Sequence, residues 1–395
     1  MESWRRNRRR ILGLTAAGAA GSAAAYTLYK WWYAESAETS EAGPSSSGSH
    51  PQEGSVLLDP RGSAGAAQLD AEAHLQHHFD SIQDIADSTT LPSLLPALSR
   101  ALMAAADVET PLELLRRAKE GSAPLSQAEK LATWEELKVA AFSRAVGAAW
   151  LLPLLDLFVR VQLNILGRHL YLESAVEGSG VQRPLGVPKL SAPSQERFLS
   201  FAEFLSQQGT RELVGVLRRV AVTQLAHVPL AESLSAAQVQ QLMAGIAAAF
   251  ADQIPAAIAG RGWAQFLLPD PKSLQESLTP RAPDDRAVLL GAEAMLVDGH
   301  VVEQLAAEAE AVASGDEFAA ALQVCSKEVL KVASHRLGSS MGDRELPLAK
   351  AVPLVATLGG DLLSPALRPP LARLEPVRSL SSRVYGCCFC ADTPL

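Results

Sequence analysis

The longest nearly uninterrupted apolar stretch of the chain covers residues 134–167, and it leaves two choices for the fold. A helix over residues 139–159 has the length to cross a membrane, which takes about 20 apolar residues. Arg144 and Asp156 interrupt this stretch, however, and each would be costly in lipid. We therefore expect a helix buried inside a large helical domain, kinked at Pro153, and not a second membrane span.

The composition favours an all-α fold. Hydrophobic residues make up 48% of the 395 residues, enough for a sizeable core, and aromatic residues make up only 5%. Ala and Leu dominate while β-branched runs are scarce, which favours helix over sheet. The formal net charge of -8 argues against a nucleic-acid partner, because nucleic-acid-binding domains usually carry a net basic face.

The first 34 residues combine a basic block with an uncharged apolar segment. Residues 11–29 carry no charge, and the aromatic residues 31–33 that follow suit the interface of a bilayer. We interpret residues 1–34 as a basic N-terminus and a transmembrane anchor. A cleaved signal with small residues at Ala23 and Ala25 is one alternative, and a mitochondrial presequence is another. The basic block consists of Arg5, Arg6, Arg8, Arg9 and Arg10.

Three further segments follow the anchor. Residues 35–65 are rich in Ser, Gly, Glu and Pro, which predicts a flexible linker. Helical periodicity then dominates residues 66–380, where we expect one large, elongated helical-bundle domain. Residues 381–395 predict a disordered, Cys-rich tail that is a candidate for acylation near a membrane. Its cysteines are Cys387, Cys388 and Cys390.

The polar residues within the predicted helices give no sign of catalysis. His74 and His78 lie four residues apart, which suits a metal pair, but no further ligand completes a metal motif. Arg160 and Asn164 share a helix face near Gln162, and we interpret these three residues as a buried network that fixes helix packing. The chain has no phosphate-binding, dinucleotide-binding, hydrolase or metalloprotease motif. We therefore predict neither enzymatic activity nor a cofactor.

A mixed apolar and basic helix face precedes the long apolar stretch. Ser126 followed by Glu129 is a capping box, which predicts that a helix starts there. Trp134 is by base rates a core residue, but the charged residues around it indicate a helix end close to water. A Trp beside long aliphatic stems is typical of a groove that binds a partner. Spacing of three and four residues places on neighbouring rows Lys130, Leu131, Trp134, Leu137 and Lys138.

Residues 134–175 carry a set of motifs in one order and spacing, without a gap. They include Trp134-Glu135-Glu136-Leu137-Lys138, Phe142-Ser143-Arg144 and Arg160-Val161-Gln162-Leu163-Asn164-Ile165-Leu166-Gly167. This set resembles the peroxisomal biogenesis factor 3 (peroxin three) family. Further segments similar to the family are His78-Phe79-Asp80-Ser81, Leu94-Leu95-Pro96-Ala97-Leu98 and Leu346-Pro347-Leu348-Ala349-Lys350. The resemblance covers most of the chain and is patchy over residues 227–345.

The resemblance implies a docking receptor that is not an enzyme. Members of the family are single-pass peroxisomal membrane proteins, and the bulk of each chain faces the cytosol. They bind the chaperone-receptor peroxin nineteen, which delivers peroxisomal membrane protein cargo. Trp134 matches the family's Trp in the groove that takes an amphipathic helix of this partner, and Lys130 matches a Lys four residues earlier. Leu114 and Leu115 match a Leu-Leu pair that precedes the motif.

The resemblance also bears on the membrane. It implies contact with peroxisomal membrane lipid and makes the basic block part of a targeting signal. The family's N-terminus lies on the matrix side, whereas the positive-inside rule would keep five arginines in the cytosol. The second hypothesis, from another class, is an exported all-helical protein with a cleaved N-terminal signal.

Overall fold

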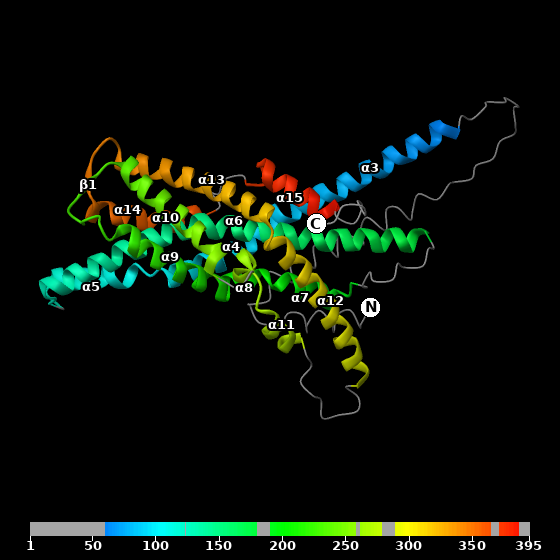
Figure 1. The fold of residues 1–395 in the computed structure, drawn as a ribbon, viewed down its shortest axis with the longest axis horizontal. Helices are drawn as coiled ribbons and strands as arrows, with labels where there is room; N and C mark the ends of the chain where they lie inside the picture. The colour runs from blue at the N-terminus through cyan, green and yellow to red at the C-terminus, as the bar shows by residue number, and fades with distance from the viewer. Residues whose placement is uncertain are drawn as a thin grey trace, which may run out of the picture.

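A computed structural model describes residues 60–122, 124–179, 190–257, 261–278, 289–364 and 371–386. These residues form an elongated bundle of α-helices, so the predicted all-α fold is confirmed (Figure 1). Within them, sheet is limited to a two-stranded antiparallel ribbon, in which Ser233–Leu234 (β1) pairs with Leu346–Pro347 (β2). The basic block, the predicted anchor and the three cysteines of the tail lie outside the described residues.

The helices follow one another along the chain. The first half contains α3 (Pro60–Ile85), π-helix η1 (Ala86–Thr90), α4 (Leu91–Ala105), α5 (Glu109–Glu120), α6 (Gln127–Ser179), α7 (Ala192–Ser200), α8 (Ala202–Phe204), π-helix η2 (Leu205–Gly209) and α9 (Thr210–Leu225). The second half contains α10 (Ala236–Ala257), 3-10 helix η3 (Gly262–Phe266), α11 (Pro271–Leu278), α12 (Leu289–Ala313), α13 (Asp316–Met341), α14 (Leu348–Leu362), 3-10 helix η5 (Leu371–Arg373) and α15 (Glu375–Gly386).

Helix α6 is the axis of the bundle. Its 53 residues correspond to a length of about 80 Å at 1.5 Å per residue, and α14, α13, α9 and α15 pack along it. Among the described residues α6 alone has the length and apolar character of a membrane span, and its apolar window is completely buried in the bundle. The prediction of a buried helix over residues 139–159 is therefore confirmed. The helix continues through Pro153.

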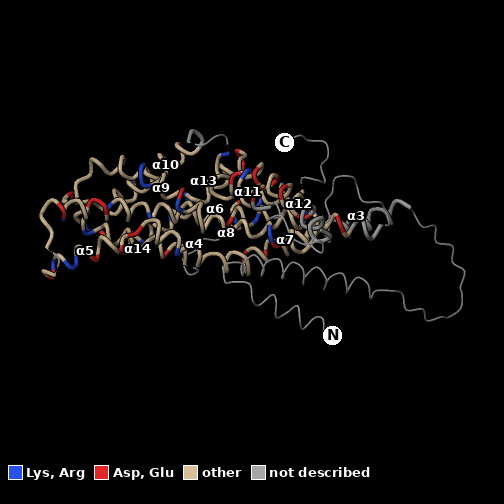
Figure 2. Tube along the Cα trace, turned by 90° about the horizontal axis from the view of Figure 1, so that it is seen from below, with Lys and Arg blue, Asp and Glu red and all other residues tan. Residues whose placement is uncertain are grey.

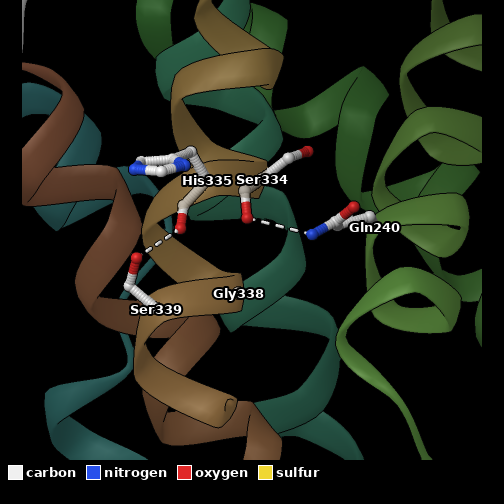
Figure 3. Close-up of a pocket in the computed structure, with 5 residues that line it drawn as sticks. All are labelled: Gln240, Ser334, His335, Gly338 and Ser339. Carbon is white, nitrogen blue, oxygen red and sulfur yellow. Dashed lines mark hydrogen bonds between the residues drawn. The ribbon is translucent and has the colours of Figure 1, made fainter. Parts of the chain in front are cut away.

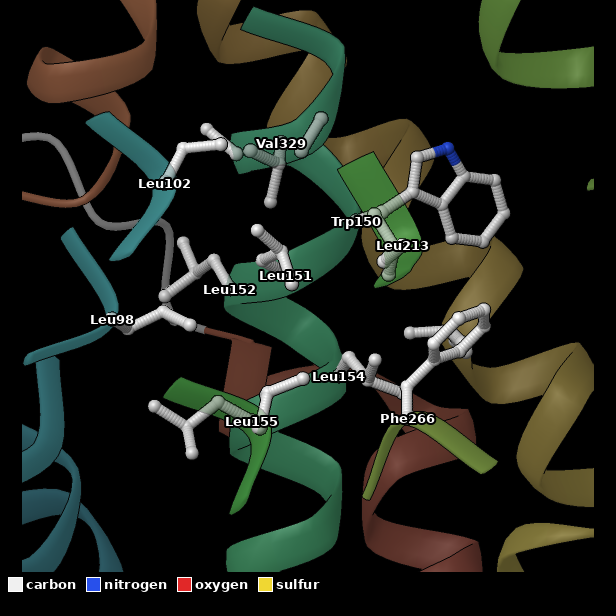
Figure 4. Packing of buried hydrophobic residues seen from close by; sticks show 14 of the residues in the cluster. Leu98, Leu102, Trp150, Leu151, Leu152, Leu154, Leu155, Leu213, Phe266 and Val329 are labelled. Carbon is white, nitrogen blue, oxygen red and sulfur yellow. The ribbon is translucent and has the colours of Figure 1, made fainter. Parts of the chain in front are cut away.

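The core surrounds the middle of α6 (Figure 4). Branched and aromatic side chains from α4, α9, η3 and α13 meet those of α6, and each is at most 3% exposed. A core of this kind holds a long helix in place because every face of it is covered by apolar side chains. The side chains drawn and labelled are Leu98, Leu102, Trp150, Leu151, Leu152, Leu154, Leu155, Leu213, Phe266 and Val329.

The buried polar residues of α6 tie it to its neighbours, as the sequence predicted. Arg160 donates to the Gln83 side chain (3.0 Å) and pairs with Asp87 and Asp156. Asn164 donates to the Arg160 carbonyl (2.8 Å), and Gln162 donates to the Phe198 carbonyl (2.6 Å). The interpretation of Arg160, Gln162 and Asn164 as a packing network is therefore confirmed.

Two predicted domain boundaries fall inside helices. α3 begins at Pro60, within the segment predicted as linker over residues 35–65. α15 continues to Gly386, so residue 381, the predicted start of a disordered tail, lies in the middle of a helix. Val384 and Tyr385 are both buried, which explains why this last helix is ordered to its end.

Candidate partner-binding site

The candidate site is the helical hairpin of α5 and the start of α6, at one end of the bundle (Figure 1). α5 ends at Gly121, whose φ of 79° is left-handed and favours glycine as a C-cap. α6 begins with the predicted capping box. The Ser126 N–H donates to Glu129 Oε2 (2.7 Å), and the Glu129 N–H donates to Ser126 Oγ (3.2 Å). The helix start predicted from the sequence is confirmed.

A buried arginine fixes the base of this hairpin. Arg144 of α6 donates through both terminal nitrogens to the Glu109 carboxylate of α5, at 2.8 and 2.6 Å. Its Nε donates to the Ala106 carbonyl (2.8 Å), at the end of α4. These hydrogen bonds lower the pKa of Glu109. Arg144 is thus satisfied in the protein interior, and its presence does not require water or lipid headgroups.

Apolar side chains remain uncovered on this hairpin. Leu131 is 58% exposed and Leu114 is 41% exposed. Together with Val222 of α9, at 54%, they are the exposed large hydrophobic residues of the described chain. Trp134 and Leu115 are partly buried and pack against the main core. The hairpin therefore presents two exposed leucines together with Trp134, which is partly buried against the main core.

Charged residues border these apolar side chains. Lys130 is exposed one residue before Leu131. Glu136 lies 3.8 Å from Arg218 of α9, which joins the outer face of α9 to the start of α6. On α5, Arg116 and Arg117 pair with Glu113, and these hydrogen bonds lower the pKa of the exposed Glu113 to about 2. In the part of the bundle that Figure 2 colours, residues of both signs are interspersed.

Leu137 and Lys138 do not belong to the exposed face, so their assignment to a partner-binding surface was wrong. Leu137 is fully buried and Lys138 is 2% exposed. The Lys138 ammonium donates to the carbonyls of Leu225 (3.2 Å) and Val228 (3.0 Å), and it pairs with Glu135 (2.6 Å). Lys138 thus donates to the last carbonyl of α9, at Leu225, and to the Val228 carbonyl three residues beyond the helix.

Helical spacing predicted correctly that these residues lie on neighbouring rows of one helix. It could not predict which of them are buried by other segments of the chain. The segment after α9 folds over α6 at Lys138, and from Leu137 to Arg168 every residue of α6 is buried. Sequence reasoning also did not single out Val222 of α9. The five arginines of the basic block lie outside the described residues.

The other candidates have structural roles. His78 is buried, and its Nδ1 lies 2.5 Å from Tyr385 Oη. Burial, with smaller contributions from His74 and His77, lowers the pKa of His78 to about 4. The described residues contain no group of three or more potential metal ligands. The metal pair of His74 and His78 is therefore not supported by further ligands.

A shallow surface pocket lies between α10 and α13 (Figure 3). Its polar groups are largely used within the protein: Gln240 Nε2 donates to the Ser334 carbonyl (2.9 Å), and Ser339 Oγ donates to the His335 carbonyl (3.0 Å). Gly338 completes the lining. This pocket gives no arrangement for catalysis, so the hairpin stays the principal candidate.

Comparison with known proteins relates this chain to one family. The family model described as Peroxin-3 matches residues 117–352, well over half of the chain. Peroxisome biogenesis protein 3-2 of Arabidopsis thaliana is 27% identical over 89% of this chain and 87% of its own length. Peroxisome biogenesis protein 3-1 of the same plant is 33% identical over 53% of each chain.

An animal protein is similar over a shorter part. Peroxisomal biogenesis factor 3 of Mus musculus is 35% identical over 45% of this chain and 44% of its own length. The match with the family model includes the end of α5, the start of α6 and most of the bundle. By this match the chain belongs to the peroxin-3 family.

Proposed function

We propose that this chain is a docking receptor of the peroxisomal membrane, and that its α5–α6 hairpin receives an amphipathic helix of the chaperone-receptor peroxin nineteen. Membership of the peroxin-3 family gives the coarser statement, a role in peroxisome membrane biogenesis. The partner, the delivery of membrane protein cargo and the absence of enzymatic activity belong to the proposal. So do a single-pass anchor, contact with peroxisomal membrane lipid and a cytosolic bundle.

One observation carries the proposal: Leu131 is 58% exposed one turn before Trp134, which is itself half-buried. The helix that bears them is buried in the bundle starting at Leu137. A partner helix recognises apolar anchors at spacings of three and four residues in a groove with charged edges. Leu131 and Trp134 have this spacing, and Lys130 supplies a charged edge on the same turn.

The expected energies separate the contributions of these residues. Covering the exposed parts of Leu131 and Leu114 would contribute about 1 kcal/mol each, since full burial of a Leu is worth about 1.5–3 kcal/mol. A Trp at the centre of an interface typically costs about 2 kcal/mol or more when truncated. We therefore expect Trp134→Ala to weaken binding about 30-fold or more, and Leu131→Ala about fivefold.

Titration calorimetry of the full chain in detergent micelles with a peroxin nineteen peptide tests this. Val222→Ala is the matched control, because Val222 of α9 is as exposed as Leu131 but lies on another helix. Circular dichroism must show that all variants remain folded. Unchanged affinity for folded Trp134→Ala, or an equal loss in Val222→Ala, contradicts the proposal.

The membrane arrangement needs a separate measurement. Protease protection of an N-terminal tag on isolated peroxisomes is expected if the N-terminus lies in the matrix, while the bundle should be digested. Intact-mass measurement distinguishes the exported alternative: a chain cleaved near Ala25 supports export, and an intact N-terminus supports the anchor.

A further inference from the structure

Among its described side chains, helix α3 becomes buried in the bundle only toward its C-terminal end. Of its described side chains between residues 73 and 77, Leu75 is the one that is partly buried, and the rest are exposed. His78 is the first fully buried residue, and Ile82 follows it one turn later. The half of α3 that follows the N-terminal segment therefore depends on the contacts made around His78.

The last helix of the chain and α6 both contact His78, and the hydrogen-bonding contact comes from the last helix. The Tyr385 hydroxyl of α15 lies 2.5 Å from His78 Nδ1. The Tyr385 ring lies 5.5 Å from the Phe79 ring and 5.7 Å from the His78 ring, measured between centroids. Aromatic pairs at such distances contribute about 0.5–1.5 kcal/mol each beyond their buried area. On the other side, Tyr171 of α6 lies 5.4 Å from His78.

α15 is in turn fastened to the bundle by a buried arginine. Arg168 of α6 is 2% exposed and donates to the Val384 carbonyl (2.6 Å), one residue before Tyr385. This carbonyl belongs to the last turn of α15, where no helical N–H is available. Arg168 also pairs with Glu308 of α12. Val377 and Leu380 bury the rest of the inner face of α15.

We propose that α15 is a strap that holds α3 against α6, so that the end of the chain fixes the position of the helix that follows the N-terminal segment. Figure 1 shows α15 (red) lying beside α3 (blue) where α3 leaves the bundle. Release of α15 would remove Tyr385 from His78 and Phe79 together. Residues 73–81 of α3 would then lose these aromatic contacts, keep those with α6, and open more readily.

Hydrogen-exchange mass spectrometry of the full chain in detergent micelles tests the strap. Tyr385→Ala should raise the exchange rate of amides in residues 73–81 by about tenfold or more, whereas α4 should not change. Tyr385→Phe keeps the ring and removes only the hydroxyl, so it should give a smaller rise in the same residues. The matched control is Arg378→Ala, on the exposed face of α15.

Two results would overturn the inference. One is unchanged exchange in residues 73–81 with both Tyr385 variants, which would mean that α6 alone holds α3. The other is an equal rise in α3 and α4, which would mean that Tyr385 stabilises the whole bundle and not one helix. A rise confined to α3 and α15, absent in Arg378→Ala, supports the strap.

Discussion

Lys138 offers a sharp test of how the end of α6 is built. Its ammonium is buried and contacts three oxygens: the carbonyls of Leu225 and Val228, and the Glu135 carboxylate. Lys138→Met keeps most of the aliphatic stem and removes the charge with its donors. The Val228 carbonyl then loses this donor, the Leu225 carbonyl keeps the Val228 N–H, and the Glu135 carboxylate loses its partner.

The magnitude follows from these contacts. A buried acceptor left without a donor costs about 1–3 kcal/mol, and this applies to the part-buried Val228 carbonyl, because the Leu225 carbonyl also accepts from the Val228 N–H (3.2 Å). Glu135 is about half exposed, so the loss of its ion pair adds little once water screens the carboxylate. We therefore expect Lys138→Met to lower the free energy of unfolding by about 1–3 kcal/mol. The Met side chain retains the apolar contacts of the stem, so cavity formation contributes little.

The assay is urea unfolding of the full chain in detergent micelles, followed by circular dichroism. Lys130→Met is the matched control, because Lys130 lies two turns earlier on the same helix and is exposed. Its free energy of unfolding should stay within about 0.5 kcal/mol of that of the unmodified chain. Equal effects of the two substitutions would refute the argument that the buried contacts of Lys138 stabilise the end of α9.

Two further predictions concern the bundle. Gly209→Ala should destabilise the protein by about 1–3 kcal/mol or more, because a Cβ there would lie 1.9 Å from the Phe266 carbonyl oxygen. Gly215→Ala has open space around its Cβ and should stabilise α9 by up to about 1 kcal/mol. Thermal unfolding compares the two variants, and equal shifts in melting temperature contradict the prediction. Acid should also destabilise the fold, because burial holds the pKa of His78 near 4 in the folded chain. Below pH 6.5 the unfolded chain therefore binds a proton at His78 that the folded chain does not bind. This difference lowers the free energy of unfolding by up to about 3 kcal/mol between pH 6.5 and 4. Urea unfolding at pH 7 and pH 5 measures this loss, and it should shrink in His78→Gln; an identical loss in that variant would contradict the assignment to His78.

Local sequence signals predicted those features that depend on neighbours along one helix. The capping box of Ser126 and Glu129 set the start of α6, and it needed nothing from elsewhere in the chain. Arg144 and Asp156 indicated burial in protein because lipid would penalise both charges. The structure confirms that reasoning, since Arg144 finds Glu109 and the end of α4.

Features set by distant segments could not be predicted in this way. Lys138 donates to the carbonyl of Val228, 90 residues further along the chain, and the spacing of residues within α6 cannot predict this contact. α15 is ordered to Gly386 because Tyr385 meets His78, 307 residues away. The segment around Tyr385 is short, has polar residues on one side and is followed by cysteines. Its local composition therefore favoured a disordered tail.

The change from open to enclosed along α6 limits where a partner can bind. Leu131 is 58% exposed, Trp134 is half-buried and Leu137 is fully buried, within two turns of one helix. A docked helix on this hairpin therefore has access to the first turns of α6 and to α5, whereas residues 137–168 of α6 are buried in the bundle. α5 buries only Pro111 completely, so its apolar contacts with α6 are shallow. A partner that covered Leu114 and Leu131 would add apolar contact to both helices of the hairpin at once, and binding should therefore stabilise α5 more than any other helix.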